Sequence, residues 1–295
     1  METPDTVLPD PDVEDGIKYW TAQPANYDGV LGGFGTGSLP RVDALGSRQL
    51  LMHLLPELCT VPSAVRRLDA SPASALAPRP RALDVGAGVG RVTSDVLLHL
   101  FADVVLVEPV APFVQEALRR GRASSGADGA HADTGADAER APWKGIRERT
   151  KSVTFVQATL QDFDPAAPVA TAAGVTVLGR VGRVPAPDEP AEEKFDVVMC
   201  QWCLGALSDP DLVAFLRKAR AALRDPARGL VVVKENLCSE DGGPRSVFDE
   251  SDSSLTRSDL AWKECFAAAG LKMVYEQIQL GFPEGLYPVK MYALR

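Results

Sequence analysis

The chain has 295 residues, of which 45% are hydrophobic and 24% are charged, as in an ordinary soluble globular protein. Its formal net charge of −9 at pH 7 repels phosphate backbones, which argues against nucleic-acid binding and suits a basic partner such as a cationic peptide. No apolar run approaches the roughly 18 residues of a membrane helix, and the acidic N-terminus lacks the pattern of a secretion signal. We therefore expect a cytoplasmic protein, with the nucleus as a second location, and no membrane or nucleic-acid partner.

The N-terminal part of the chain, residues 1–58, is expected to be an extension, helical from residue 11 and outside the sheet that follows. Three later stretches look like insertions because they are rich in Ala, Gly, Ser or Pro and have weak periodicity; they lie near 60–80, 121–150 and 166–193. The third contains a run at 175–178 that could form a short strand. Without these insertions, residues 81–295 have the size of one compact domain.

Between the insertions, apolar β-rich runs alternate with helical patterns. Strands are expected at 81–85, 103–108, 153–158, 195–201 and 229–234, and helices at 92–101, 112–120 and 211–223. This alternation predicts a parallel sheet with helices on both faces. Two further strands, 272–279 and 288–294, follow a helix at 257–269, and the short connection between them requires an antiparallel pair. The layout is that of a Rossmann-like α/β fold of the class I methyltransferase type, with a seven-stranded, mostly parallel sheet and an antiparallel C-terminal hairpin.

A glycine-rich loop, DVGAGVGR at residues 84–91, joins the first strand to the first helix of this domain. Its spacing is G-x-G-x-G, and Arg91 stands where a dinucleotide-binding loop needs its last glycine. The next strand ends at Glu108, a suitable position for a carboxylate that accepts both ribose hydroxyls. S-adenosylmethionine carries a ribose and an amino-acid end but no pyrophosphate, so carboxylates at Asp84 and Glu108 suit it better than a dinucleotide. We predict S-adenosylmethionine as the cofactor; the alternative is that Glu108 is only a polar strand end.

The five cysteines are scattered through a chain too large to need a disulfide framework. Cys200 and Cys203 form a lone CxxC without the second pair of a zinc ribbon, and the three histidines have no metal-binding spacing. We expect no metal site, and expect these cysteines to be buried near a strand end.

Several motifs outside the glycine loop are more specific. They are YW at 19–20, YDGVLGGFG at 27–35, LQDF at 160–163, QW at 201–202, KEN at 234–236, DESDSS at 249–254, and Tyr287 with ALR at 293–295. In this set and order the chain resembles the protein N-terminal (α-N) methyltransferases, which act on proteins that begin with Xaa-Pro-Lys after removal of Met. The resemblance covers nearly the whole chain outside the insertions. It implies an enzyme whose partners are protein N-termini, ribosomal proteins among them, and we expect it to be a monomer.

The resemblance also implies which residues form the site. The cofactor would be bound by Gly86, Arg91, Glu108, Pro109, Leu160, Gln161 and Gln201. The substrate would be bound by Trp20, Leu31, Gly32, Trp202, Asn236, Asp249, Asp252, Ser254 and Tyr287. Within the second set, Trp202 would flank the proline ring, Asn236 would hydrogen-bond the peptide backbone, and the acidic run at 249–254 would surround the lysine. The glycines at 32–33 would belong to a lid over the peptide; a simple tight turn is the alternative. Alone, the acidic run would be read as an exposed loop capping the next helix.

Two residues of the substrate set, Asp252 and Asn236, are the catalytic candidates. A free α-amine has a pKa of about 7.7–8.0, so an appreciable fraction is neutral near pH 7 and no strong base is needed. Asp252 is the candidate for assisting proton removal. The family commonly has a histidine four residues after the tryptophan, and here that position is Ala206. Gly37 and Gly285 also depart from the family pattern, which puts peptide selectivity in question.

Two other functions remain open. A small-molecule methyltransferase on the same sheet would need a closed apolar pocket, and a catalytically silent interaction protein would show a degraded glycine loop or a lost ribose carboxylate. The peptide assignment requires Trp202, Asn236, Asp249 and Asp252 to converge on one groove beside the glycine loop.

Overall fold

The computed structural model describes residues 8–59, 79–126, 141–170, 172–189, 194–240 and 245–295. Residues 60–78, 127–140, 171 and 190–193 of the three expected insertions therefore lie outside the described residues.

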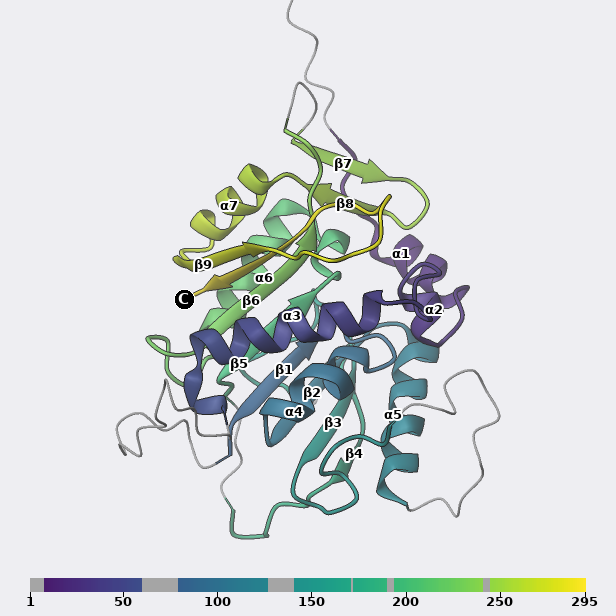
Figure 1. Cartoon of the computed structure of the whole chain (residues 1–295), viewed down its shortest axis with the longest axis vertical. Helices are drawn as coiled ribbons and strands as arrows, with labels where there is room; N and C mark the ends of the chain where they lie inside the picture. The colour runs from purple at the N-terminus through teal and green to yellow at the C-terminus, as the bar shows by residue number, and fades with distance from the viewer. Residues whose placement is uncertain (1–7, 60–78, 127–140, 171, 190–193, 241–244) are drawn as a thin grey trace, which may run out of the picture.

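The described chain alternates helices and strands (Figure 1). The helices are α1 (Val13–Thr21), α2 (Tyr27–Val30), α3 (Leu39–Leu54), η1 (Pro56–Leu58), η2 (Thr93–Leu97), α4 (Leu98–Leu100), α5 (Ala111–Ser125), η3 (Leu204–Ala206), α6 (Asp209–Ala221) and α7 (Asp259–Ala268). The strands are β1 (Arg81–Val85), β2 (Asp103–Val107), β3 (Ser152–Gln157), β4 (Thr176–Gly182), β5 (Val197–Gln201), β6 (Leu230–Asn236), β7 (Ser246–Asp249), β8 (Ser254–Arg257), β9 (Met273–Ile278) and β10 (Val289–Leu294).

The central sheet has the order β4-β3-β2-β1-β5-β6-β10-β9. Neighbouring strands from β3 to β6 in this order pair in parallel, and β10 pairs antiparallel with both β6 and β9. The predicted parallel sheet and antiparallel C-terminal hairpin are confirmed. Every residue of β1 and β5 is buried, which explains their continuous apolar sequences.

The sheet has one strand more than the seven expected. The additional strand, β4, lies at the edge and pairs antiparallel with β3. It comes from the third expected insertion and includes most of the short strand anticipated at 175–178. An antiparallel edge strand needs no crossover helix, so it can be added without disturbing the parallel core.

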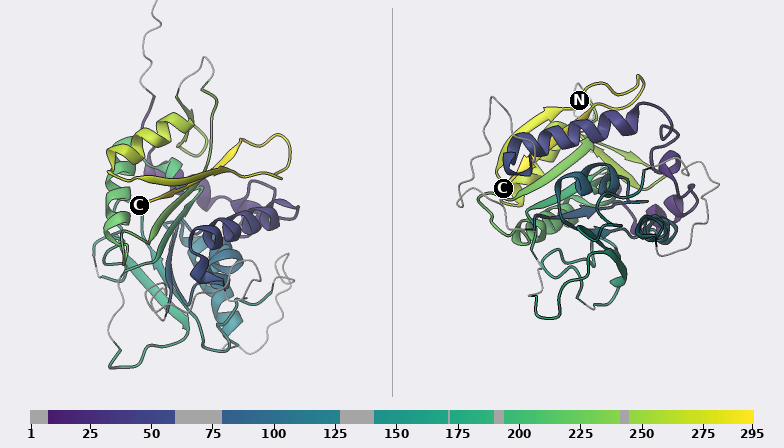
Figure 2. Two further views of the ribbon diagram at one scale, coloured as in Figure 1. Left: turned by 60° about the vertical axis from the view of Figure 1, so that its left-hand side comes forward. Right: turned by 60° about the horizontal axis from the view of Figure 1, so that its bottom comes forward.

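Helices cover both faces of the sheet, as Figure 2 shows in its left-hand view. The apolar side chains of α6 and α7 pack on one face, in a cluster that includes Phe215 and Trp262. Those of α3, η2, α4 and α5 pack on the other face, in a cluster that includes Leu51 and Phe101. The domain is therefore a three-layer α/β sandwich.

The helix α3 belongs to this packing although it comes from the N-terminal extension. Its buried residues recur every three or four positions, which is the period of an amphipathic helix; they are Leu39, Pro40, Asp43, Ala44, Ser47, Leu50 and Leu51. Most are apolar, but Asp43 is completely buried. A carboxylate on a helix face that packs against the core requires specific partners.

The acidic run at 249–254 belongs to a small hairpin that was not predicted: it includes the end of β7, the turn and the start of β8. This hairpin is tied to the start of α1. The Asp12 carboxylate caps α1 by accepting hydrogen bonds from the backbone N–H groups of Glu14 and Asp15. The Asp12 N–H in turn donates to the Ser253 hydroxyl at 2.8 Å. Two segments at opposite ends of the chain thus meet beside the sheet.

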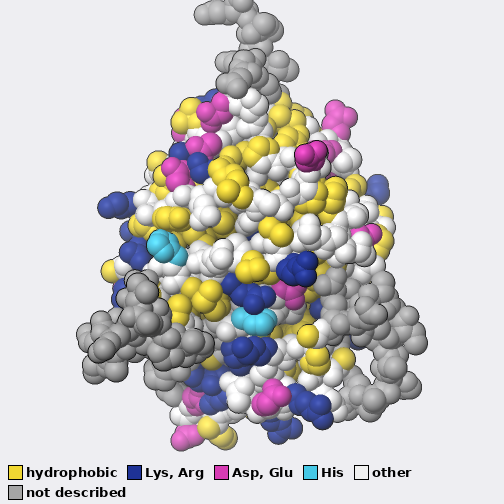
Figure 3. Space-filling view, in the orientation of Figure 1, with side chains coloured by type: hydrophobic (Ala, Val, Ile, Leu, Met, Phe, Trp, Pro, Cys, Tyr) yellow, Lys and Arg dark blue, Asp and Glu magenta, His cyan; other side chains and the backbone are white. Residues whose placement is uncertain are grey.

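The face carrying α3 has an uneven distribution of side chains (Figure 3). Hydrophobic side chains predominate on its upper part and Lys and Arg on its lower part, although the chain as a whole has a net charge of −9. In the part of the chain that the structure describes, no helix has both the length and the apolar character needed to cross a membrane.

Candidate active site

A cavity of about 410 Å³ opens at the carboxyl ends of the parallel strands. Gly86, Glu108, Gln201 and Asn236 reach it from the ends of β1, β2, β5 and β6. Open α/β sheets bind their ligands at this edge. All residues predicted to bind the cofactor line the cavity, namely Gly86, Arg91, Glu108, Pro109, Leu160, Gln161 and Gln201.

The glycine loop adopts a backbone that only glycine tolerates well. Gly86 has φ 61° and Gly88 has φ 56°, both in the left-handed region. A Cβ atom on Gly86 would lie 2.2 Å from the Cβ of Cys203. The loop is therefore pressed against the segment after β5, and its free surface faces the cavity.

Glu108 is held beside this loop by backbone donors. Its carboxylate accepts hydrogen bonds from the N–H of Gly88 at 2.8 Å and of Val110 at 2.9 Å. Burial raises the pKa of Glu108 to about 7, although these hydrogen bonds oppose the shift. Its carboxylate is therefore fixed at the cavity wall, in a place that suits the predicted role of accepting hydrogen bonds from ribose hydroxyls.

Asp84, the carboxylate at the start of the glycine loop, does not line the cavity. It is buried and accepts a hydrogen bond from the Thr93 hydroxyl at 2.6 Å, and burial raises its pKa to about 6. The expectation that Asp84 contributes to the ligand surface is corrected: the side chain turns inward and ties β1 to η2.

A buried charged cluster lies behind Arg91. The carboxylate of Asp43 pairs with Arg91 and Lys234, each at 2.5 Å, and accepts hydrogen bonds from the Gln201 amide at 2.9 Å. Burial alone would raise the pKa of Asp43, but the two cations lower it to about 2. We refer to Asp43, Arg91, Gln201 and Lys234 as the Asp43 cluster. Asp43 and Lys234 were not predicted from the sequence to belong to the site.

Eight of the nine residues predicted to bind substrate line the same cavity: Trp20, Leu31, Gly32, Trp202, Asn236, Asp252, Ser254 and Tyr287. Asp249 does not. It is exposed at the end of β7, and its carboxylate accepts hydrogen bonds from the backbone and hydroxyl of Ser251. Three of the four residues required to converge therefore do so, and a role for Asp249 toward a substrate lysine stays a prediction.

Trp202 has a strained backbone, with φ 53°, an unusual conformation for a large side chain that tends to occur at functional sites. Its ring lies 5.4 Å from the Arg91 guanidinium and 6.0 Å from the Phe282 ring. Its buried Nε1 donor has no hydrogen-bond partner among the described residues. Trp202 thus offers the cavity an aromatic face and an unused donor.

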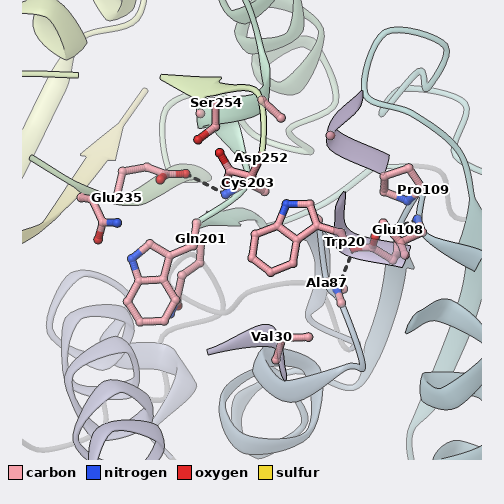
Figure 4. A pocket seen from close by; sticks show the side chains of 18 of the residues that line it. Trp20, Val30, Ala87, Glu108, Pro109, Gln201, Cys203, Glu235, Asp252 and Ser254 are labelled. Atoms are coloured by element: carbon pink, nitrogen blue, oxygen red, sulfur yellow. Dashed lines mark hydrogen bonds between the residues drawn. The ribbon is translucent and has the colours of Figure 1, made fainter. Parts of the chain in front are cut away.

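Asp252 also lines the cavity. In Figure 4, Asp252 and Ser254 are at the top of the view, Glu108 and Pro109 are at the right, and Trp20 lies between them. The Asp252 side chain is partly buried, and its Oδ1 has no hydrogen-bond partner within the described chain. Burial raises the pKa of Asp252, while hydrogen bonding to Ser254 opposes the shift.

Other residues of the cavity were not foreseen. The buried Glu235 accepts a hydrogen bond from the N–H of Cys203 at 2.9 Å (Figure 4) and another from the N–H of Leu204 at 3.0 Å. Burial raises the pKa of Glu235 to about 7. The sequence offered one indication that Glu235 belongs to the site, namely its position in the KEN motif at 234–236. Cys200 is buried as expected, whereas Cys203 is only partly buried and lines the cavity.

Of the three residues that depart from the family pattern, Ala206, Gly37 and Gly285, only Ala206 lies at the cavity. Ala206 lines the cavity, so the missing histidine leaves open space there. Gly37 and Gly285 do not line it, and a Cβ on either would meet nothing within 4 Å. The glycines at 32–33 form a tight turn with φ 57° and 91°; closure of this segment over a peptide stays a prediction.

A sequence profile described as AdoMet dependent proline di-methyltransferase matches residues 10–169 and 178–295. The chain belongs to this family. The resemblance inferred from the motifs is thereby confirmed, as is S-adenosylmethionine as the cofactor. The residues present fit that cofactor, because the glycine loop, Glu108 and Gln201 all line one cavity, and the buried Oε1 of Gln201 has no hydrogen-bond partner among the described residues.

Relatives of the proline di-methyltransferase family cover almost all of the chain. It is 32% identical to alpha N-terminal protein methyltransferase 1 of Schizosaccharomyces pombe, over 95% of this chain and 94% of the relative. It is 28% identical to the human N-terminal Xaa-Pro-Lys N-methyltransferase 1, over 94% and 92% of the two chains. The structure of a SAM-dependent methyltransferase from Leishmania major has a TM-score of 0.63 and 29% identity, covering 96% and 82% of the two chains. The expected class of enzyme, a protein methyltransferase, is therefore confirmed.

Proposed function

We propose that the protein methylates the α-amine of proteins that begin with Xaa-Pro-Lys once Met has been removed, and that Asp252 assists the reaction. The observation that carries the proposal is the convergence of Trp202, Asn236 and Asp252 on the cofactor cavity. Two of these side chains, Trp202 and Asp252, present buried polar atoms without partners in the described part of the chain. Buried polar atoms are normally satisfied, so a polar ligand between them is the simplest occupant.

The chemistry of the three side chains matches that of the peptide. The flat face of Trp202 can pack against a proline ring. The Asn236 amide can both donate to and accept from a peptide backbone, and Asp252 supplies a carboxylate for a cationic group. Trp20 and Tyr287 add aromatic surface to the same cavity.

The bound cofactor supplies a methyl group on a positively charged sulfur. The residues of the chain then have to align the α-amine, exclude water and remove a proton. Because an α-amine has a pKa of about 7.7–8.0, part of it is neutral at physiological pH, and alignment contributes more than basicity. The raised pKa of Asp252 makes it a better proton acceptor than an ordinary carboxylate. With Ala206 in place of a histidine, Asp252 takes this role.

The proposal extends to the partners and location of the protein. We infer that it acts as a monomer in the cytoplasm and nucleus, on proteins with basic N-termini, ribosomal proteins among them, without binding nucleic acid. The net charge of −9 supports a basic protein partner, since charge complementarity speeds encounter with such a substrate. Titration of a tRNA and of a basic Xaa-Pro-Lys protein against the enzyme tests this: binding of the RNA as tight as that of the protein contradicts it.

Neither alternative function receives comparable support. A small-molecule methyltransferase with a closed apolar pocket does not require Glu235 and Asp252 at the cavity wall. A catalytically silent protein would not need to keep the positive-φ glycine loop and Glu108 in a binding arrangement.

The proposal is tested by methyl transfer from labelled S-adenosylmethionine to matched peptides. The expected result is rapid labelling of Xaa-Pro-Lys, a loss of at least about tenfold in kcat/KM for Xaa-Pro-Gln through the lost ion pair, and no labelling of an N-acetylated Xaa-Pro-Lys peptide. Equal turnover of the Lys and Gln peptides would contradict recognition of the lysine. Labelling of the acetylated peptide would show that the acceptor is not the α-amine.

A further inference from the structure

The Asp43 cluster joins the cofactor cavity to the N-terminal helix α3. Asp43 comes from α3, Arg91 from the end of the glycine loop, Gln201 from β5 and Lys234 from β6. Asp43 and Lys234 are completely buried, and Arg91 and Gln201 are 4% and 6% exposed. Only Arg91 and Gln201 of the four line the cavity. Asp43 is therefore placed behind two cofactor-binding residues without access to the cofactor.

The groups in direct contact carry one negative and two positive charges. An uncompensated buried charge is costly, so proteins pair such charges or bind a counterion. Within the cluster Asp43 is shared between two cations, and of these Arg91 is the one that lines the cavity. The carboxylate at the amino-acid end of S-adenosylmethionine is a suitable further partner for Arg91.

The hydrogen bonds of Asp43 also determine which polar atoms of Gln201 and Arg91 are already paired. Asp43 takes both hydrogen bonds that Gln201 Nε2 donates and one from Nη1 of Arg91. The amide orientation of Gln201 is thereby fixed, and its Oε1 acceptor is left buried and unpartnered among the described residues. An acceptor at Gln201 and a cation at Arg91 are what the ammonium and carboxylate of an amino acid require.

We propose that Asp43 is a positioning residue for the cofactor, which fixes Gln201 and Arg91 so that they receive the amino-acid end of S-adenosylmethionine. Through Asp43, α3 becomes a part of the cofactor site. Lys234 also links this helix face to the β9–β10 connection. Its Nζ donates hydrogen bonds to Ser47 of α3 at 3.1 Å and to Gln279 after β9 at 3.0 Å. The proposal depends only on the cofactor, and it stands whether or not the substrate is Xaa-Pro-Lys.

The test compares two ligands that differ only at the amino-acid end. S-adenosylhomocysteine has this end, and 5′-methylthioadenosine has the same nucleoside and sulfur without it. Their Kd values are measured by titration calorimetry on the full-length protein and on Asp43→Asn. We expect the variant to weaken S-adenosylhomocysteine binding about 10- to 100-fold, the effect of losing charge-assisted hydrogen bonds, and methylthioadenosine binding less than about threefold. Equal weakening of both ligands, or weakening of neither, overturns the proposal.

Two further variants separate positioning from folding. Asp43→Asn combined with Lys234→Met restores the single excess positive charge of the cluster and should recover thermal stability, while selective loss of S-adenosylhomocysteine binding persists. If this double variant binds both ligands as the wild type does, Asp43 acts through charge balance alone and its positioning role is refuted. Ser47→Ala is the matched control, since Ser47 is buried on the same helix face and contacts Lys234 but neither Gln201 nor Arg91. It should leave the ratio of the two Kd values unchanged, and a loss equal to that of Asp43→Asn would also refute the proposal.

Discussion

The buried carboxylate of Glu108 should make cofactor binding depend on pH near neutrality. Burial raises its pKa to about 7, so in the free protein this group is protonated below pH 7. Two ribose hydroxyls can donate to the carboxylate only when it is ionised, because the protonated acid loses acceptor capacity. Ribose binding therefore lowers the pKa of Glu108 and releases a proton when the solution is below pH 7.

The magnitude follows from linkage. For a pKa of about 7, the apparent Kd is multiplied by about 11 at pH 6, by about 2 at pH 7 and by about 1.1 at pH 8. Affinity should therefore rise about tenfold between pH 6 and pH 8 and change little above that. An ordinary glutamate with a pKa of about 4.3 would give no change in this range.

The assay is titration calorimetry with 5′-methylthioadenosine, which carries the ribose without an ionisable amino-acid end. Paired titrations in two buffers with different ionisation enthalpies count the protons released, which should approach one at pH 6 and fall toward zero at pH 8. Glu108→Gln should bind more weakly and without this pH dependence. Glu235→Gln is the matched control, because Glu235 has a similarly raised pKa of about 7 but accepts its hydrogen bonds from the segment after β5.

A flat affinity between pH 6 and pH 8 in the unmodified protein would refute the reasoning. The same conclusion follows if Glu108→Gln keeps the tenfold change or if Glu235→Gln abolishes it, because another group would then be titrating.

Three further predictions concern substrate, loop and stability. Asp252→Asn should lower kcat/KM for an Xaa-Pro-Lys peptide about 100-fold, in the range of general-base effects. Asp249→Asn should act only through a higher KM and change kcat/KM less than about threefold, because an ion pair between the exposed Asp249 and the substrate lysine would be weak. Steady-state kinetics checks both variants, and equal effects would contradict the prediction. Gly86→Ala should abolish the thermal stabilisation by S-adenosylhomocysteine because the new Cβ would lie 2.2 Å from a cysteine side chain, whereas Gly37→Ala, with no atom within 4 Å, should keep it. Arg257→Leu should cost about 3 kcal/mol in urea unfolding, since two buried carbonyls and a carboxylate lose their donor; a cost below about 1 kcal/mol would show that these bonds contribute little.

The sequence allowed the parallel part of the sheet to be predicted almost completely because β1, β2, β3, β5 and β6 are buried along nearly their whole length. A continuous apolar run such as that of β1 can be predicted to be a buried strand without knowing which strands pair with it. The hairpin β7–β8 was missed for the opposite reason. Its strands have four residues each and alternate in burial, and its turn is acidic, so local sequence favours an exposed loop. The edge strand β4 was anticipated only as a short run inside an insertion.

The site could be predicted where a motif carries the residues, and not where long-range packing does. The motifs located eight of the nine substrate residues in the cavity, but they gave no means of separating Asp249 from Asp252. In the structure Asp249 ends β7, whereas Asp252 lies in the turn that follows, next to Ser253 at φ 53°. Of the two carboxylates, only that of Asp252 lines the cavity. Asp43 belongs to none of the motifs. The only indication in the sequence that it is part of the site was its position as a charged residue on the apolar face of an amphipathic helix.

The pairing of Asp43 with Lys234 also bears on how the protein is made. The two residues are separated by 191 positions along the chain, and α3 leaves the ribosome long before β6 does. Pairings of such separation form late in folding, and larger proteins pass through incompletely packed intermediates. A nascent chain therefore carries α3 with an unpaired carboxylate on its apolar face, and a pocket able to hold the cofactor exists only once the chain has been synthesised through β6.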